Sequence, residues 1–385
     1  MSPRHKILAL MEATSVTGPA KNLLGYCRWL KSAEGLRTGL HIAVTAFERG
    51  SSPGSENGFL DAARDAGIDT YLIRERFRYD PGVVAQLREI LAAFTPAIIQ
   101  THSNKSHLIV RSLSPARRHH LWFAFHHGDT HTNLKQRAYN QVDRLTLPSA
   151  HRVVTVCQAF VPQLVSRGVD PSRIRVLPNT AIPVRPIPEA ERRQLREELA
   201  IGSDEAVILT VGRLSREKGQ EYLIRALTLL PPAAQAWRLI VLGSGPDLDR
   251  LQALANALGV TPRVLFVGFR QDVAPFYAIA SVFALPSLAE GSSNVLLEAM
   301  SASLPIVATR VGGTPEVAVH NETALLVAAA DPVALAGALT HLSTDHALAS
   351  RLAATAQARA TAEFSEHRYR QRLSSVYEEA IGAGP

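Results

Sequence analysis

Short apolar runs alternate with amphipathic stretches of helical length along the whole chain. In the first half, residues 20–35 and 81–94 have helical periodicity. Apolar runs that predict strands lie at residues 6–12, 39–47, 69–74, 97–102, 121–127, 152–157 and 173–178. Strands that are apolar throughout and separated by helices are typical of a parallel sheet covered on both faces. The first half therefore predicts one α/β domain.

A proline-dense segment at residues 177–191 interrupts this alternation. Proline disfavours both helix and sheet, so we interpret the segment as a linker. The alternation then restarts, and strands are predicted at residues 206–212, 237–243, 263–268, 281–287, 304–309 and 323–327. Residues 345–383 are rich in Ala, Arg and Glu and predict helix. The second half therefore predicts a second domain of the same class.

The complete pattern predicts two doubly wound α/β domains that face an interdomain cleft. A chain of 385 residues exceeds the usual size of a single core, which agrees with two domains. We expect an N-terminal acceptor-binding domain at 1–184, a C-terminal donor-binding domain at 185–363, and a helix at 364–385 that packs back toward the N-terminal domain. In such sheets ligands bind outside the carboxyl ends of the strands.

Composition narrows the class of protein. The chain is 46% apolar and 19% charged, and it has no run of about 20 apolar residues that would predict a membrane span. Its first residues predict a strand and not a signal peptide. Cys27 and Cys157 are too few for a disulfide framework, and we expect both to be buried. These features predict a cytoplasmic protein, either free or peripheral on the inner face of the membrane.

Positive charge is concentrated in the first half of the chain. Residues 1–184 carry a net charge of +10 and the remainder carries −3. A basic domain suits an acidic partner such as nucleic acid, anionic lipid headgroups or a charged substrate. No aromatic-interleaved basic strand or recognition helix accompanies the charge, so nucleic acid is not an expected partner. The arginines that suggest an anionic membrane surface are Arg74, Arg76, Arg78, Arg117 and Arg118.

The residues that suggest chemistry follow predicted strands of the second half. Gly212 ends the strand predicted at 206–212, and Arg213 and Lys218 follow it. Two cations at this position suit a pyrophosphate. A surface arginine and lysine at a helix start is the alternative interpretation.

A second group of polar residues lies in the stretch AEGSSNVLLEAM. Ser293 or Asn294 is a suitable N-cap, so Glu290 is expected on the loop and Glu298 one turn inside the helix. Free N–H groups at the helix start suit phosphate oxygens, and each carboxylate can accept hydrogen bonds from two sugar hydroxyls. This arrangement suits a ribose and a second sugar on either side of a diphosphate. An exposed helix glutamate and a turn glutamate are the alternatives.

Together with the later segment LPIVATRVGGTPEV, these motifs resemble the retaining glycosyltransferases of family four, which have the GT-B fold. The resemblance implies transfer of a sugar from a nucleotide-diphosphate sugar with retained anomeric configuration and no metal or other cofactor. It implies that Arg213 and Lys218 neutralise the diphosphate and act in catalysis together with Glu290. The donor-binding residues that it implies are Gly18, Arg213, Lys218, Glu290, Gly291, Asn294, Val295 and Glu298.

The first half resembles the family less closely. Gly18 matches the first glycine of the family's loop after the first strand, whereas Pro19 replaces the second and removes a backbone donor. His127 precedes Gly128 and matches the active-site histidine, with His126 as the other candidate. The alternative is a packed histidine at a strand end. The family role is a hydrogen bond near the donor sugar.

Several alternatives remain open at this stage. Asp247 and Asp249 have the spacing of a metal-binding diaspartate, but they open a predicted helix, where we expect a capping role and no metal site. The resemblance implies a saccharide or lipid-linked acceptor in cell-surface polysaccharide or glycolipid synthesis. It leaves both front-side attack and double displacement open. The alternative functions are a nucleotide-sugar epimerase and a basic nucleic-acid-binding protein.

Overall fold

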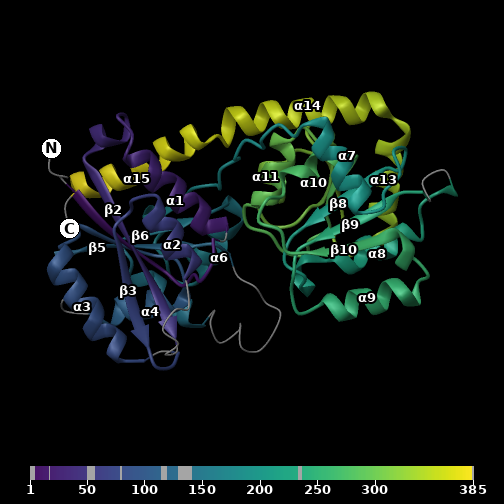
Figure 1. Cartoon of the computed structure of the whole chain (residues 1–385). Coiled ribbons are helices and arrows are strands. Elements are labelled where there is room, and N and C mark those ends of the chain that lie inside the picture. Colours follow the sequence, from purple (N-terminus) through teal and green to yellow (C-terminus); the bar gives the residue numbers. More distant parts are fainter. Residues whose placement is uncertain are drawn as a thin grey trace. The chain divides into compact units, whose positions relative to one another are not determined.

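The computed structural model describes residues 5–16, 18–49, 57–78, 80–113, 119–128, 141–232 and 236–383. The chain forms two compact units (Figure 1). Unit 1 comprises Met1–Asn179 and Tyr369–Pro385, and unit 2 comprises Thr180–Arg368. The first boundary between the units follows Asn179, five residues before the boundary expected at 184/185. The chain re-enters unit 1 at Tyr369, five residues after the start of the C-terminal helix expected at 364.

Unit 1 contains a parallel sheet in the order β3-β2-β1-β4-β5-β6-β7. The strands lie where the apolar runs of the first half predict them. They are buried because helices cover both faces of the sheet. The strands are β1 (His5–Met11), β2 (Leu40–Arg49), β3 (Thr70–Glu75), β4 (Ile98–Thr101), β5 (Leu121–His126), β6 (Arg152–Thr155) and β7 (Ile174–Val176).

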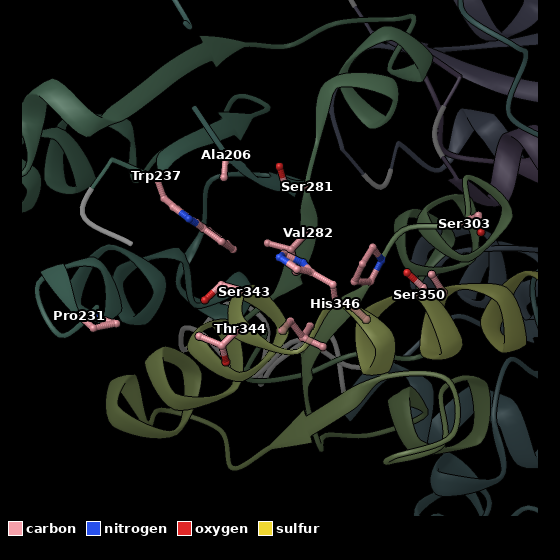
Figure 2. A pocket seen from close by; sticks show the side chains of 14 residues that line it. Ala206, Pro231, Trp237, Ser281, Val282, Ser303, Ser343, Thr344, His346 and Ser350 are labelled. Atoms are coloured by element: carbon pink, nitrogen blue, oxygen red, sulfur yellow. The ribbon is translucent and has the colours of Figure 1, made fainter. Parts of the chain in front are cut away.

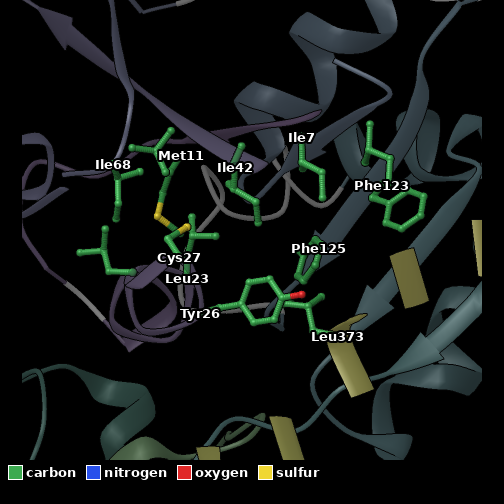
Figure 3. Close-up of a cluster of buried hydrophobic side chains, with 14 of the residues drawn as sticks. Ile7, Met11, Leu23, Tyr26, Cys27, Ile42, Ile68, Phe123, Phe125 and Leu373 are labelled. Atoms are coloured by element: carbon green, nitrogen blue, oxygen red, sulfur yellow. The ribbon is translucent and has the colours of Figure 1, made fainter. Parts of the chain in front are cut away.

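Two apolar clusters cover this sheet. On one face, α1 (Gly18–Leu30), α2 (Gly58–Asp65) and the C-terminal part of α15 (Glu366–Ala383) pack around Tyr26, Phe123 and Leu373 (Figure 3). On the other face lie α3 (Gly82–Phe94), α4 (Asn104–Ser112) and α6 (Val161–Ser166). Cys27 and Cys157 are buried free thiols, as predicted, and burial raises the pKa of Cys27 to about 12.

Unit 2 contains a second parallel sheet, in the order β10-β9-β8-β11-β12-β13. Its strands confirm the apolar runs of the second half. They are β8 (Val207–Val211), β9 (Arg238–Leu242), β10 (Val264–Gly268), β11 (Val282–Leu285), β12 (Ile306–Thr309) and β13 (Leu325–Val327).

Helices also cover both faces of the second sheet. One face carries α8 (Gln220–Leu227), α9 (Leu248–Ala257) and α13 (Pro332–Thr344). The other carries α7 (Glu189–Glu198), α10 (Ala274–Ile279) and α11 (Asn294–Ser301), while α14 (His346–Glu363) contributes to both clusters. A short helix, α12 (Thr314–Val317), follows β12.

The linker is irregular, as predicted. Between β7 and α7 it makes only an isolated bridge, from Ala181 to Ser365. The carbonyl of Phe364 accepts hydrogen bonds from the Ala181 N–H at 2.7 Å and the Thr180 hydroxyl at 3.1 Å. The helical stretch predicted at 345–383 is divided at this point into α14 and α15, and α15 lies where a separate helix is expected at 364–385.

Both sheets reverse their strand order once. In unit 1, successive strands are added on one side of β1 as far as β3, and from β4 onward on its other side. In unit 2 the same reversal occurs between β8 and β11. Loops that leave neighbouring strands at such a switch point diverge and leave room for a ligand. Among the described residues, no helix is both long enough and apolar enough to cross a membrane.

Candidate functional site

Lys218 and Glu290 form an ion pair at the switch point of unit 2. Lys218 ends the turn that follows β8, and Glu290 lies on the loop that follows β11, the strand next to β8. The Lys218 Nζ lies 2.7 Å from the Glu290 Oε1, and the Ser287 hydroxyl donates to the same oxygen at 2.7 Å. The Glu290 side chain is 6% exposed and that of Lys218 28%. The structure thus brings together two predicted residues from distant parts of the sequence.

Two glycines fix the loop that carries Glu290. Gly312 follows β12 with φ +48°, and a Cβ there would lie 1.9 Å from the Glu290 carbonyl oxygen. The Gly313 N–H donates to that same carbonyl at 3.1 Å. Gly219 has φ +63°, and a Cβ there would lie 2.1 Å from the Pro286 carbonyl oxygen. Only glycine allows these approaches, so backbone contacts hold Glu290 against the Lys218 turn.

Arg213 lies on the same edge of the sheet and is exposed. Its carbonyl accepts a hydrogen bond from the Gln220 side chain at 2.9 Å, which fixes the backbone. Its guanidinium has no ion-pair partner within the described ranges of the chain. At this edge Lys218 is therefore a paired cation, whereas the Arg213 guanidinium is open to a ligand.

Helix α11 starts beside this pair. Ser293 is the N-cap and Asn294 the first helical residue, but no side chain caps the helix. Gly291 lies on the preceding loop, and the N–H groups of Asn294 and Val295 belong to the first turn, where no intrahelical acceptor exists. The buried Asn294 Oδ1 also has no hydrogen-bond partner among the described residues. The start of α11 therefore offers polar groups to a ligand.

Glu298 lies inside α11, as predicted, and is buried. Its Oε2 accepts a hydrogen bond from the Tyr277 hydroxyl at 3.0 Å. Burial, and to a smaller extent the negative charge of Glu298, raises the pKa of Tyr277 well above its usual value. The phenol therefore keeps the proton that it donates to Glu298. The sequence did not indicate Tyr277, because it lies on α10, which precedes β11.

In unit 1, the candidate histidine lies beside a second histidine. His126 is the last residue of β5 and is buried against the Phe160 ring, whereas His127 follows the strand. The His127 Nε2 lies 3.0 Å from the Nδ1 of His102, which follows the neighbouring strand β4. The two rings are stacked, with centroids 5.3 Å apart.

Both stacked histidines are neutral at pH 7. Burial, reinforced by His126 and His107, lowers the pKa of His127 to about 3. Burial likewise lowers the pKa of His102 well below its usual value. Sequence reasoning missed His102, although it is the last residue of a predicted strand just as His127 is. Gly18 is the first residue of α1, directly after the loop from β1.

A polar pocket of about 400 Å³ lies at the carboxyl ends of β1, β2 and β3 in unit 1. Its lining comprises Glu12, Thr14, Phe47, Glu48, Arg49, Asn57 and Glu75. Glu75 accepts from Arg49 at 2.8 Å and also binds Lys105, whose side chain is fully buried. Opposite charges are therefore paired in this pocket, which suits a polar ligand of low net charge.

Another pocket, of about 480 Å³, lies in unit 2 at the amino ends of the strands, at the edge of the sheet opposite to Lys218 and Glu290 (Figure 2). It is lined by Ala206 before β8, Trp237 before β9 and Ser281 before β11, with His346 from α14. Because ligands of doubly wound sheets bind at the carboxyl ends of the strands, this pocket is separate from the candidate site.

Asp247 and Asp249 open helix α9, as predicted. Asp247 occupies the N-cap position of α9 but makes no side-chain cap bond. Its carboxylate instead accepts from Arg250 at 2.6 Å, because that guanidinium lies one turn along the helix. No group of three metal-ligating side chains is found in the part of the chain that the structure describes.

The basic arginines of unit 1 are partly paired. Arg76 binds Asp80 at 2.8 Å and Arg78 lies 3.4 Å from Glu12. Arg74 is exposed, while Arg117 and Arg118 lie outside the described residues.

Both halves of the chain match families of glycosyl transferases. Residues 17–180 match the family described as "Glycosyl transferase 4-like domain", and residues 191–359 match "Glycosyl transferases group 1".

Curated relatives match about half of the chain. The lipopolysaccharide core biosynthesis glycosyltransferase LpsE of Rhizobium meliloti is 32% identical over 49% of this chain and 54% of its own. A GDP-mannose-dependent alpha-(1-6)-phosphatidylinositol monomannoside mannosyltransferase of Mycolicibacterium smegmatis is 33% identical over 54% and 55%. The chain thus spans about half the length of the curated relatives it matches.

Solved structures show the same fold over almost the whole chain. HepE of Anabaena, solved with UDP-glucose, superposes with a TM-score of 0.83 at 21% identity, over 98% of this chain and 100% of that one. Sucrose-phosphate synthase of Thermosynechococcus elongatus gives 0.81 at 22% identity, over 99% and 100%. The two Rossmann-like units therefore have the GT-B fold. The matches favour glycosyl transfer over the epimerase and the nucleic-acid alternatives.

Proposed function

We propose that this chain, whose residues 17–180 and 191–359 match glycosyl transferase families, transfers a sugar from a nucleotide-diphosphate sugar to a saccharide or lipid-linked acceptor. The observation that carries the proposal is the ion pair of Lys218 and Glu290 beside the start of α11. A cation, a carboxylate and free N–H groups at one switch point suit a diphosphate joined to a polyhydroxylated ring.

In this proposal the residues of unit 2 divide between the phosphates and the rings. Arg213, Lys218 and the N–H groups of Asn294 and Val295 stabilise the negative charge that develops on the departing diphosphate. Glu290 accepts from hydroxyls of the transferred sugar, and Glu298 from those of the ribose.

The proposed reaction retains the anomeric configuration of the sugar and requires no metal ion. Two cations and a helix start supply the positive charge that a divalent ion would supply elsewhere, so transfer is expected to persist in excess EDTA. The departing phosphate would then take the acceptor proton in a front-side attack, and a double displacement remains the other route. Loss of all turnover in EDTA that added Mg²⁺ restores would contradict this assignment.

Thermal unfolding with a panel of UDP-, GDP- and ADP-sugars tests the proposal. A ligand that binds only the folded state stabilises it by about 2.7 kcal/mol at a hundredfold excess over its Kd, which shifts Tm by a few degrees. One donor class is expected to raise Tm, and its transfer product is expected to retain the anomeric configuration in proton NMR. A panel in which no nucleotide sugar changes Tm would contradict the proposal.

The acceptor side is assigned to unit 1. The polar pocket beside Glu75 suits the hydroxyl groups of a saccharide, and the net charge of +10 in residues 1–184 suits an anionic lipid surface. Lipopolysaccharide and phosphatidylinositol mannoside synthesis, named for two relatives, supply acceptors of this class. A peripheral position on the inner face of the membrane follows from this assignment.

Vesicle sedimentation at low salt tests the membrane assignment. The protein is expected to sediment more with vesicles that contain phosphatidylglycerol than with pure phosphatidylcholine, because exposed cations such as Arg74 attract anionic headgroups. Arg74→Glu is expected to weaken the difference, while Arg216→Glu, on the other unit, serves as the matched control. Equal sedimentation with both vesicles would remove the support for this assignment.

A further inference from the structure

Four side chains of unit 1 form a continuous hydrogen-bonded chain that ends at His127. Tyr377, on the C-terminal helix α15, donates from its hydroxyl to the Gln100 Oε1. The Gln100 Nε2 contacts the His102 Nε2, and the His102 Nδ1 lies 3.0 Å from the His127 Nε2. Gln100, His102 and Tyr377 are not among the residues assigned to the substrate.

We propose that Tyr377, Gln100 and His102 act as positioning residues that fix His127 in the tautomer with its proton on Nδ1. A hydroxyl that donates to Oε1 sets the amide of Gln100, so its NH₂ group faces His102 and donates. The His102 Nε2 then accepts, and the proton of that ring lies on Nδ1. This Nδ1–H donates to the His127 Nε2, which leaves the His127 proton on its own Nδ1.

The surroundings support each step of this assignment. Burial keeps the pKa of both imidazoles far below 7, so each ring carries one proton and the direction of the chain is set from its far end. Burial also raises the pKa of Tyr377, which stays a donor. His102 stacks on Phe125 and on His127, so both rings are held in orientation as well as in tautomer.

The hydrogen-bonded chain ends at a buried polar atom, the His127 Nδ1. The His127 Nδ1 has no hydrogen-bond partner among the described residues, although it is shielded from solvent. A buried N–H without an acceptor is unfavourable, and a ligand oxygen would satisfy it. His127 therefore presents a fixed donor, which suits an oxygen of the substrate that gains negative charge.

Long-range nitrogen–proton NMR on histidine-labelled protein measures this tautomer directly. In the unaltered protein, His102 and His127 are both expected to carry the proton on Nδ1, with signals assigned from His102→Gln and His127→Gln. Tyr377→Phe removes the first donor, so Gln100 is free to turn and the His127 signal is expected to shift toward the Nε2–H form. Gln100→Met is expected to have the same effect at nearly the same side-chain volume.

Tyr26→Phe is the matched control. The Tyr26 hydroxyl makes a similar buried hydrogen bond to α15, at 2.7 Å to the Ser374 hydroxyl, but it lies outside the chain that ends at His127. This variant is expected to leave both histidine signals and turnover unchanged. Tyr377→Phe is expected to lower kcat roughly tenfold, the worth of about one hydrogen bond, without changing KM for the donor.

The effect on kcat rests on the proposed function, whereas the tautomer does not. An Nε2–H signal for His127 in the unaltered protein would overturn the inference, as would equal effects of Tyr377→Phe and Tyr26→Phe. The expected signals in a protein that transfers no sugar would instead support the hydrogen-bonded chain and contradict the proposed function.

Discussion

Lys218→Ala is expected to lower kcat/KM by roughly 100- to 1000-fold, the usual cost of removing one group that stabilises developing negative charge. The cation lies 2.7 Å from Glu290 and beside the start of α11, where the proposal places the diphosphate. Steady-state transfer with the donor identified in the thermal panel measures the loss. Arg216→Ala is the matched control, because it removes an exposed cation from the same turn. An equal effect of both variants would show that overall charge matters and not the position of Lys218.

Stability must be separated from catalysis in this experiment. Without Lys218, a carboxylate that is 6% exposed loses its countercharge, at a cost on the order of 1–3 kcal/mol. Combining Lys218→Met with Glu290→Gln removes both charges and is expected to restore the unfolding midpoint while turnover stays low. Recovered turnover in this double variant would make the pair structural and would contradict its assignment to the diphosphate and the sugar.

Gly312→Ala is expected to destabilise unit 2 by about 2–4 kcal/mol and to abolish donor binding. The added Cβ would lie 1.9 Å from the Glu290 carbonyl oxygen, a backbone atom that can move only if the whole loop moves. A left-handed φ of +48° adds strain for any residue with a Cβ. Chemical unfolding measures the first effect, and the Tm shift with donor measures the second.

Gly259→Ala separates the clash from the backbone strain. Gly259 also lies in unit 2 with a left-handed φ, +66°, but a Cβ there would meet nothing within 4 Å. Its cost is therefore expected to stay near the strain alone, about 1–2 kcal/mol, with donor binding intact. Matching losses in the two variants would contradict the idea that Gly312 holds the Glu290 loop.

In two regions of this chain, contacts that the sequence does not reveal determine the detail of the structure. A separate helix is expected at 364–385 and α15 lies there, but the bonds from Thr180 and Ala181 to the Phe364 carbonyl, about half the chain away, could not be predicted. Asp247 lost its expected capping role because Arg250 offers a charged partner one turn further along α9. At Asp247 the charged contact outweighed a local capping preference that is worth about 1 kcal/mol.

The sequence by itself determined the strands of both sheets, the irregular linker and the positions of Glu290 and Glu298 before and inside α11. These features are local, because period, proline content and helix starts act over a few residues. Only the tertiary structure decided that Lys218 pairs with Glu290 and that His102 contacts His127. Such partners depend on which strands become neighbours, and strand order is set by the packing of the whole sheet and its covering helices.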